Sequence, residues 1–171
     1  MKRILIIGCS GAGKSTLASE LGAGLGLPVY HLDKLFWRPG WVEAPLEEFD
    51  AKLAELLKTE CWIMDGNYNR TLPERLKYAD TVIFLRYSRW TCLWRVLKRR
   101  IKYHGCTRAD ITDGCPERLD REFLRYIWNY NRDMLPRVNA AIAGSNAKIL
   151  VFRTPRETED YLRANASSVA R

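Results

Sequence analysis

A glycine-rich segment near the start of the chain has the residue types needed to bind a nucleoside triphosphate. Residues 8–15 read Gly-Cys-Ser-Gly-Ala-Gly-Lys-Ser, which is glycine, four residues, glycine, lysine and serine. Glycines let the backbone wrap so that successive N–H groups point at phosphate oxygens, and a following helix adds its positive end. The pattern predicts that ATP is bound by Gly8, Ser10, Gly11, Ala12, Gly13, Lys14, Ser15 and Thr16.

Polar side chains in and beyond this segment predict how the phosphates and their metal are held. Lys14 can reach the terminal phosphates as a fixed cation, and the Ser15 hydroxyl can ligate the Mg²⁺ that bridges them. Asp65 closes an apolar run, so its carboxylate should stand at the carboxyl end of a strand and hold Mg²⁺ partly through water. The alternative for Asp65 is a carboxylate that caps the turn before Gly66. ATP and Mg²⁺ are the predicted cofactors.

Asp33 is the candidate for contact with the group that accepts the phosphate. It lies just past the second apolar run, at the sheet edge where ligands bind in α/β folds. There its carboxylate can orient an acceptor hydroxyl, with a modest effect, because phosphoryl transfer depends mainly on alignment and charge neutralisation. The alternative for Asp33 is a helix cap.

Arginines recur at helical spacing on both sides of a polar loop. Arg95 and Arg99 lie four residues apart, and after the loop Arg118, Arg121 and Arg125 follow at spacings of three and four. An arginine guanidinium can donate two parallel hydrogen bonds to the oxygens of a transferred γ-phosphate. The two sets of arginines are therefore predicted to bind the γ-phosphate from opposite sides. The alternative is a solvated basic face. The predicted catalytic residues are Lys14, Asp33, Arg95, Arg99, Arg118 and Arg121.

These residues need a scaffold, and the apolar pattern predicts an α/β fold with a parallel sheet. Short apolar runs alternate with helical stretches, as in strand-helix-strand units. Each run is too apolar for a strand wetted on one face, so helices should cover both faces of the sheet. The predicted strands are Arg3–Ile7, Val29–Leu32, Cys61–Met64, Thr81–Leu85 and Lys148–Phe152.

Four helices and a lid are expected between and after these strands. The first helix runs from the turn at 13–15 to the glycines at 22–26, and the second follows Pro45. The third carries an apolar stripe of Trp90, Leu93, Trp94, Leu97 and Ile101. Residues 103–116 lack periodicity and read as a lid. A long helix is predicted from Pro116 to about Ala143, kinked near Pro136, with inward side chains of Leu124, Ile127, Trp128, Met134 and Val138.

Length and composition favour one folded domain spanning residues 1–171. The chain has 47% hydrophobic and 28% charged residues, typical of a globular protein. Five scattered cysteines, no signal-peptide core and no long apolar run predict a cytoplasmic protein with reduced thiols and no membrane partner. The net charge is +8, and residues 86–108 hold eight basic residues and no acidic one. That stretch should attract nucleotide phosphates or nucleic acid.

Together these segments resemble the adenylate-kinase-like P-loop families, and most closely the bacterial adenylate-kinase-related group called topology modulation protein, or FlaR-like. The resemblance covers nearly the whole chain. Beyond the phosphate loop it rests on His-Leu-Asp-Lys-Leu-Phe-Trp at 31–37, Trp-Ile-Met-Asp-Gly-Asn-Tyr at 62–68, Gly-Cys-Pro at 114–116 and Ile-Trp-Asn-Tyr at 127–130. It implies a three-layer P-loop NTPase fold, strand order 2-3-1-4-5, an acceptor-binding segment at 33–60 and a short lid at 103–118.

The resemblance also implies roles for single residues. Arg38 and Arg70 would contact a phosphate of the acceptor. Arg95 and Arg99 would match the donor-side arginines, and Arg118 and Arg121 the arginines of the lid. Arg153, in the turn before Pro155, would lie near the adenine.

One departure from the adenylate kinase pattern bears on the acceptor. Adenylate kinases have Asp-Gly-Phe-Pro-Arg after the third strand, whereas residues 65–70 here are one residue longer and lack the proline. This argues against AMP as the acceptor. Trp37, Pro39 and Trp41 predict a small apolar-walled pocket, which keeps small hydroxylated acceptors open, as in shikimate or gluconate kinases.

Two functions follow from the sequence. The first is an ATP-dependent phosphotransferase that moves the γ-phosphate of Mg-ATP to a nucleotide or another small hydroxylated acceptor. The alternative is an ATP-dependent regulatory or DNA-associated protein that uses the basic stretch 86–108 as its contact surface. No DNA-binding motif is apparent in the sequence.

Overall fold

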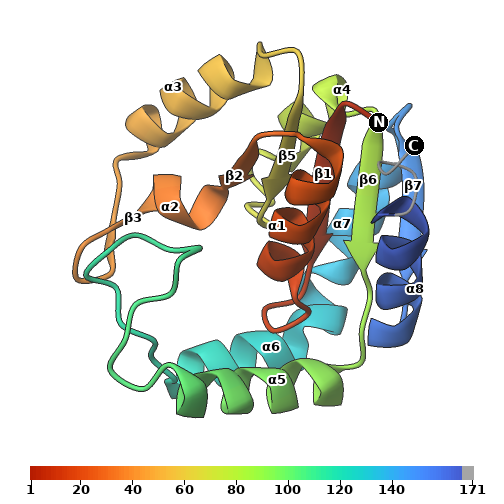
Figure 1. Cartoon of the computed structure of the whole chain (residues 1–171). Helices are drawn as coiled ribbons and strands as arrows, with labels where there is room; N and C mark the ends of the chain where they lie inside the picture. The colour runs from red at the N-terminus through yellow and green to blue at the C-terminus, as the bar shows by residue number, and fades with distance from the viewer. Residues whose placement is uncertain (167–171) are drawn as a thin grey trace.

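A five-stranded parallel sheet forms the centre of the computed structural model, which describes residues 1–166 (Figure 1). The strands are β1 (Arg3–Gly8), β2 (Val29–His31), β5 (Trp62–Asp65), β6 (Thr81–Leu85) and β7 (Lys148–Phe152). They lie side by side in the order β2-β5-β1-β6-β7, which is 2-3-1-4-5 when these five strands are counted along the chain. The predicted α/β fold class and strand order are therefore confirmed.

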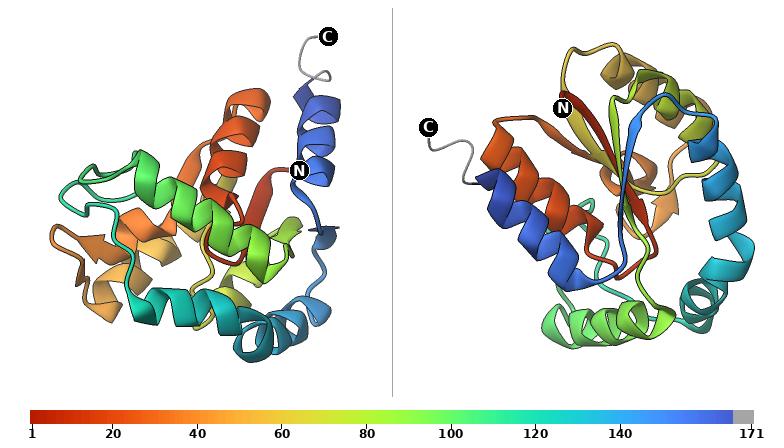
Figure 2. Two further views of the ribbon diagram at one scale, coloured as in Figure 1. Left: turned by 90° about the horizontal axis from the view of Figure 1, so that it is seen from below. Right: turned by 90° about the vertical axis from the view of Figure 1, so that its right-hand side faces the viewer.

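Helices cover both faces of the sheet, as predicted (Figure 2). On β1, Ile4 and Ile6 pack into one core and Leu5 and Ile7 into the other, because successive strand side chains point to opposite faces. The first core contains side chains of α1 (Lys14–Leu25) and α8 (Pro155–Ala166). The second contains side chains of α3 (Leu46–Leu57), α4 (Leu72–Tyr78) and α7 (Leu135–Ala143). The sheet is the middle of three layers.

The edge strand β7 is less buried than its apolar sequence predicted. Val151 is 41% exposed, and Lys148 is also exposed, whereas every residue of β6 is buried. β7 pairs only with β6 within the described sheet, so it has no neighbouring strand on its outer side. Burial on both faces therefore holds for the central strands and fails at this edge.

The long helix predicted from Pro116 to about Ala143 is wrong in its start and in its continuity. Helix α6 (Arg121–Asp133) begins five residues later, where the Asp120 side chain caps it by accepting the Phe123 N–H at 2.7 Å. It ends at Asp133, and α7 starts afresh with Pro136 in its first turn. Proline lacks the N–H that a continuous helix needs and fits a first turn, so the predicted kink is a break.

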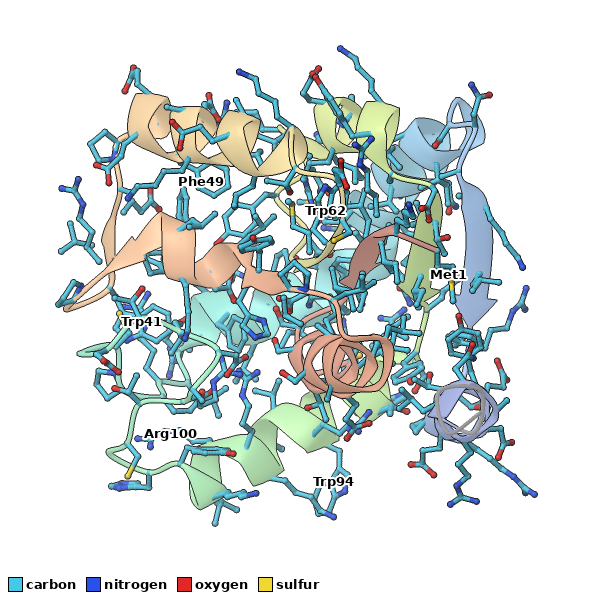
Figure 3. The ribbon with its side chains drawn as sticks, turned by 45° about the horizontal axis from the view of Figure 1, so that its top comes forward. Met1, Trp41, Phe49, Trp62, Trp94 and Arg100 are labelled. Atoms are coloured by element: carbon cyan, nitrogen blue, oxygen red, sulfur yellow. The ribbon has the colours of Figure 1, made fainter. Side chains whose placement is uncertain are left out.

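Helix α5 (Arg89–Lys102) turns its apolar stripe to solvent. Trp94 is 59% exposed and Ile101 is 79% exposed, while Cys92 and Val96 face the core. Figure 3 shows Trp94 projecting away from the sheet. Trp128 of α6 is 42% exposed, so its predicted inward position is wrong; its ring packs against that of Trp90, with centroids 5.1 Å apart. The helical spacing was sound, but a stripe does not show which face is buried.

Several elements were not predicted. They are α2 (Leu32–Phe36), the antiparallel pair β3 (Trp37–Arg38) and β4 (Val42–Glu43), and the helices α4 and α8. The first three belong to the predicted acceptor-binding segment. None of the helices within residues 1–166 has the length and apolar character that crossing a membrane demands. The last five residues of the predicted 1–171 domain lie outside the described part of the chain.

Candidate functional site

A cavity of about 1250 Å³ opens at the carboxyl end of the sheet. Its walls come from the loop between β1 and α1, from α2 and the residues after it, from α5 and from the 103–118 segment. The carboxyl edge of a parallel sheet is where α/β proteins bind their ligands. Of the predicted site residues, the cavity is lined by Ser10, Gly11, Gly13, Lys14, Ser15, Thr16, Asp33, Arg95, Arg99 and Arg118.

The loop between β1 and α1 has the backbone shape of a phosphate cradle. Gly13 adopts φ +93°, a left-handed conformation that favours glycine, and α1 starts at the next residue. A Cβ on Gly8 would lie 2.6 Å from the carbonyl oxygen of Leu85, so only glycine fits there. The Lys14 ammonium lines the cavity and donates to the Cys9 carbonyl at 3.3 Å. The loop thus presents backbone N–H groups, a helix N-terminus and one cation to the same space.

Ser15 and Asp65, the predicted metal residues, are in direct contact. The Ser15 hydroxyl donates to Asp65 Oδ2 at 2.8 Å, and Asp65 is only 4% exposed at the end of β5. The second carboxylate oxygen of Asp65 is hydrogen-bonded to Nδ1 of His31 at 2.5 Å. Burial alone would lower the pKa of His31, but the Asp65 carboxylate raises it overall. Hydroxyl and carboxylate oxygens are the hard ligands that Mg²⁺ takes, so these residues fit that ion.

Asp33 lies within α2 and lines the cavity. The helix cap is His31, so the alternative role of Asp33 as the cap is wrong. Asp33 Oδ1 accepts the hydroxyl of Tyr68 at 2.7 Å. Burial raises the pKa of Asp33 above its ordinary value, although the Tyr68 hydroxyl opposes that shift. A carboxylate with a raised pKa and one bonded oxygen can take a proton from a bound hydroxyl.

The predicted arginines divide into two groups. Arg95 reaches the phosphate loop, where its Nη1 donates to the Ala12 carbonyl at 3.2 Å. Arg99 lines the cavity beside it, and Arg118 lies across the cavity with its guanidinium 5.1 Å from the Trp41 ring centre. Arg121 is the exposed first residue of α6 and lies outside the cavity lining. The structure brings three of these four arginines to the cavity.

The three remaining basic residues named from the resemblance also lie outside the cavity lining. Arg70 makes a bidentate pair with Asp50, at 2.8 and 2.6 Å. Arg38 pairs with Glu48 on the exposed side of α3. Arg153 is exposed after β7, and its backbone N–H donates to a carboxylate oxygen of Glu157 at 2.8 Å. Within residues 1–166, therefore, Arg38 and Arg70 are paired with acidic residues in place of facing the cavity.

Sequence reasoning missed an ion-pair network at the lid. The buried Glu117 forms two ion pairs. Its Oε1 lies 2.8 Å from Nη2 of Arg99, and its Oε2 lies 3.0 Å from Nε of Arg108. Arg108 also pairs with Asp110 at 3.1 Å, and both line the cavity. Burial alone would raise the pKa of Asp110, but Arg108 and the Ser15 hydroxyl lower it overall. The lid therefore brings charged residues from 108–117 to the phosphate loop.

The loop after β5 is fixed by a second network that the sequence pattern did not indicate. Arg75 of α4 is fully buried and donates to the carbonyls of Gly66 at 2.9 Å, Tyr68 at 3.1 Å, and Asn67. Burial lowers the pKa of Arg75 to about 9. The Asn67 side chain accepts the Gly8 N–H at 3.0 Å and so ties this loop to the phosphate loop. Only the extra residue in 65–70 signalled that this loop is unusual.

The predicted lid at 103–118 rests on the predicted acceptor-binding segment. The Trp41 indole N–H donates to the Pro116 carbonyl at 3.0 Å, and Figure 3 shows Trp41 beside the lid. The Gly40 N–H donates to the Gly114 carbonyl at 2.9 Å, and the Thr112 hydroxyl donates to the Trp37 carbonyl at 2.6 Å. These contacts place residues 37–41 and 103–118 on one side of the cavity, facing the phosphate loop.

Comparison with solved structures places this fold among the P-loop kinases. A shikimate kinase from Acinetobacter baumannii in complex with shikimate matches with a TM-score of 0.59 and 16% identity, over 99% of this chain and 93% of that one. A deoxyadenosine kinase from M. mycoides with bound dATP matches with a TM-score of 0.56 and 17% identity, over 96% and 98%. A gluconokinase from Sinorhizobium meliloti 1021 matches with a TM-score of 0.56 and 15% identity, over 99% and 91%.

No protein-family model matches the chain, and no curated protein matches it by sequence. The structural matches, all below 25% identity, show a P-loop kinase-like fold and leave the activity to the residues of the site.

Proposed function

We propose that this chain is an ATP-dependent phosphotransferase that moves the γ-phosphate of Mg-ATP to a nucleotide or another small hydroxylated acceptor. One observation carries the proposal: the phosphate loop, the Ser15–Asp65 pair and the Asp33 carboxylate open onto the same cavity or border it directly. A phosphate cradle by itself is shared by ATPases, switches and kinases. A carboxylate that can receive a hydroxyl proton across the same cavity favours transfer to an acceptor.

The residues would divide the work of the reaction. The loop at 8–16 would hold the ATP phosphates, with Lys14 on the terminal ones. Ser15 and Asp65 would hold Mg²⁺, which when bound neutralises phosphate charge. Arg95, Arg99 and Arg118 would steady the charge on the group in transfer, and Asp33 would orient the acceptor hydroxyl. The contacts described above support each of these roles.

The kinase-like neighbours are consistent with this proposal. Two of them were solved with shikimate or dATP bound, so this fold holds a small hydroxylated compound in one protein and a nucleotide in another. We also propose that residues 1–171 form one cytoplasmic kinase-like domain, with an acceptor segment at 33–60 and a lid at 103–118. Membership of the topology modulation protein group stays a prediction from the resemblance.

The test is Mg²⁺-dependent release of ADP from ATP, measured with nucleosides, nucleoside monophosphates, sugar acids and DNA in turn. We expect at least one small acceptor to raise ADP release well above background, and Lys14→Ala to abolish that rise. Lys77→Ala is the matched control, because Lys77 is exposed on α4 and pairs with Glu74 away from the cavity. If ATP binds and no small acceptor changes the rate, the regulatory or DNA-associated alternative replaces this proposal.

A further inference from the structure

We infer that the acceptor is an uncharged alcohol with a flat ring, of the nucleoside class, which stacks on the aromatic wall beside Asp33. The inference rests on the proposed function and narrows its acceptor. Three features of the acceptor side of the cavity carry it. They are the aromatic wall, the arginines that are already paired with acidic residues, and the Asp33 carboxylate oxygen that accepts no hydrogen bond among the described residues.

The aromatic wall belongs to the acceptor-binding segment and the loop after β5. Phe36, Trp37, Trp41 and Tyr68 all line the cavity. The Phe36 and Trp37 rings stand edge to face with centroids 5.0 Å apart, and Trp41 continues the row at 5.4 Å from Trp37. Tyr68 lies 5.0 Å from Phe36. Rings that are fixed by each other can offer a flat ligand a stacking surface at little entropic cost.

The wall is also held in place from behind. Phe49 of α3 is buried and packs against Phe36, with ring centroids 5.6 Å apart, and Figure 3 shows Phe49 pointing from α3 toward α2. On the other side, the lid accepts the Trp41 indole N–H. A wall anchored on both sides keeps its shape when a ligand enters, which favours recognition of a rigid, planar group.

The charges on this side of the cavity disfavour an acidic acceptor. The carboxylates of Asp33, Asp110 and Glu117 line it. Arg108 is already paired with Asp110 and Glu117. A phosphate or carboxylate placed beside these groups would meet like charges and an arginine that already has partners, which is costly in a partly buried site.

The two arginines that the resemblance assigns to an acceptor phosphate, Arg38 and Arg70, are both engaged elsewhere. Arg70 is bonded to Asp50 through two nitrogens, and Arg38 is paired with Glu48. Lys34 is the remaining basic residue on this wall, and it is exposed at the surface. A bidentate pair would have to break before Arg70 could bind a phosphate. An uncharged acceptor requires no such rearrangement.

Asp33 supplies the polar end of the acceptor site. Its Oδ1 accepts the Tyr68 hydroxyl, and among the described residues no hydrogen bond reaches its Oδ2, which leaves that oxygen for the acceptor hydroxyl. In the reaction the acceptor oxygen forms a bond to the γ-phosphorus while the bond from that phosphorus to the ADP oxygen breaks. The hydroxyl proton passes to Asp33 and then to water, and the products are ADP and a nucleoside monophosphate.

The test compares acceptors of matched shape and different charge. The wild-type chain is given Mg-ATP with nucleosides and deoxynucleosides, with the corresponding 5′-monophosphates, and with shikimate and gluconate. We expect a nucleoside to give a kcat/KM at least about tenfold above that of its monophosphate. The phosphate of the monophosphate adds one unfavourable charge contact, and a contact of this kind lowers affinity by about tenfold. A monophosphate or sugar acid that is phosphorylated while nucleosides are not overturns the inference and leaves the phosphotransferase proposal standing. No acceptor-dependent ADP release from any compound overturns both.

Variants of Trp41 separate stacking from its contact with the lid. Trp41→Ala should raise the KM for the nucleoside about tenfold, because one stacking surface is lost. It also removes the ring beside the Arg118 guanidinium, so the KM and not kcat is the readout. Trp41→Phe keeps a stacking ring and removes the indole N–H that reaches Pro116, so it should restore most of the nucleoside KM. If Trp41→Phe is as impaired as Trp41→Ala, Trp41 acts through the lid and the stacking inference fails. Trp90→Ala, on the outer face of α5, is the control that should match wild type.

Discussion

The two sides of the cavity are built in different ways. The proposed donor side consists of one uninterrupted segment at 8–16 between a buried strand and a helix, together with Asp65 at the end of the neighbouring strand. The proposed acceptor side is assembled from short elements and loops at 32–43, 66–68 and 103–118, which are held by side-chain contacts between distant parts of the chain. Under the proposed function, phosphate binding would depend on the sheet, whereas acceptor choice would depend on loops that can change without changing the fold.

The largest expected effect lies on the donor side. Asp65→Asn removes the charge that would hold Mg²⁺ beside Ser15, so we expect turnover to fall about 100-fold and the Mg²⁺ concentration for half-maximal rate to rise. Steady-state kinetics over a magnesium titration measures both. Asp50→Asn, an exposed carboxylate paired with Arg70, should change neither. A fall that is equal for the two variants would break the comparison, because metal binding would then not be specific to the donor side.

The loop that joins the two sides should be the most sensitive point for stability. Arg75→Met leaves the buried carbonyls of the 66–68 loop without their donor, and we expect the free energy of unfolding to fall by about 3 kcal/mol. Chemical denaturation monitored by tryptophan fluorescence would give this value. Lys77→Met, exposed on the same helix, should stay within about 0.5 kcal/mol of wild type. If the free energy of unfolding changes by no more than about 0.5 kcal/mol in both variants, Arg75 does not hold the loop.

A smaller effect is expected at the acceptor carboxylate. Asp33 must be ionised to take a proton, and burial raises its pKa above the ordinary 3.8. The rate of transfer should therefore fall as pH drops through a value above 3.8, and it should be constant above that value until another group titrates. Asp33→Asn should lower kcat about tenfold and remove this acidic limb. An unchanged pH profile in Asp33→Asn would assign the limb to another group.

The smallest effect is expected for the arginines of the outer surface. Because Arg38 and Arg70 pair with Glu48 and Asp50 outside the cavity lining, Arg38→Ala and Arg70→Ala should each change kcat/KM by less than about twofold. Initial rates at subsaturating acceptor measure this directly. A loss of about 100-fold in either variant would place a phosphorylated acceptor at these residues and reverse the assignment of the two sides.

The difference between the two sides also explains what the sequence could predict. Ser15 and Asp65 lie 50 residues apart, yet their contact follows from two buried strands whose carboxyl ends share an edge. In the Tyr68–Asp33 and Glu117–Arg99 contacts, at least one partner lies in a loop or a short helix without an apolar period, so no pattern predicts which residues meet. The start of α6 was missed for the same reason, since Asp120 competes with Pro116 as a start signal.

The spacing of apolar residues also could not predict which face of a helix is exposed to solvent. The stripe of α5 has the spacing of a buried helix face, but the described fold buries Cys92 and Val96 in its place. A helix at the rim of a sheet contacts neighbours on one narrow side, and its sequence does not state which side that is.

The most direct test of the central claim is to follow the labelled γ-phosphate of ATP. Wild-type chain and Lys14→Ala are incubated with Mg²⁺, γ-labelled ATP and the panel of acceptors, and the labelled products are separated. We predict a labelled phosphoester of at least one acceptor with wild type and none with Lys14→Ala. If wild type binds ATP but the label appears only in ATP or in inorganic phosphate for every acceptor, the chain is not a phosphotransferase for this class of compounds.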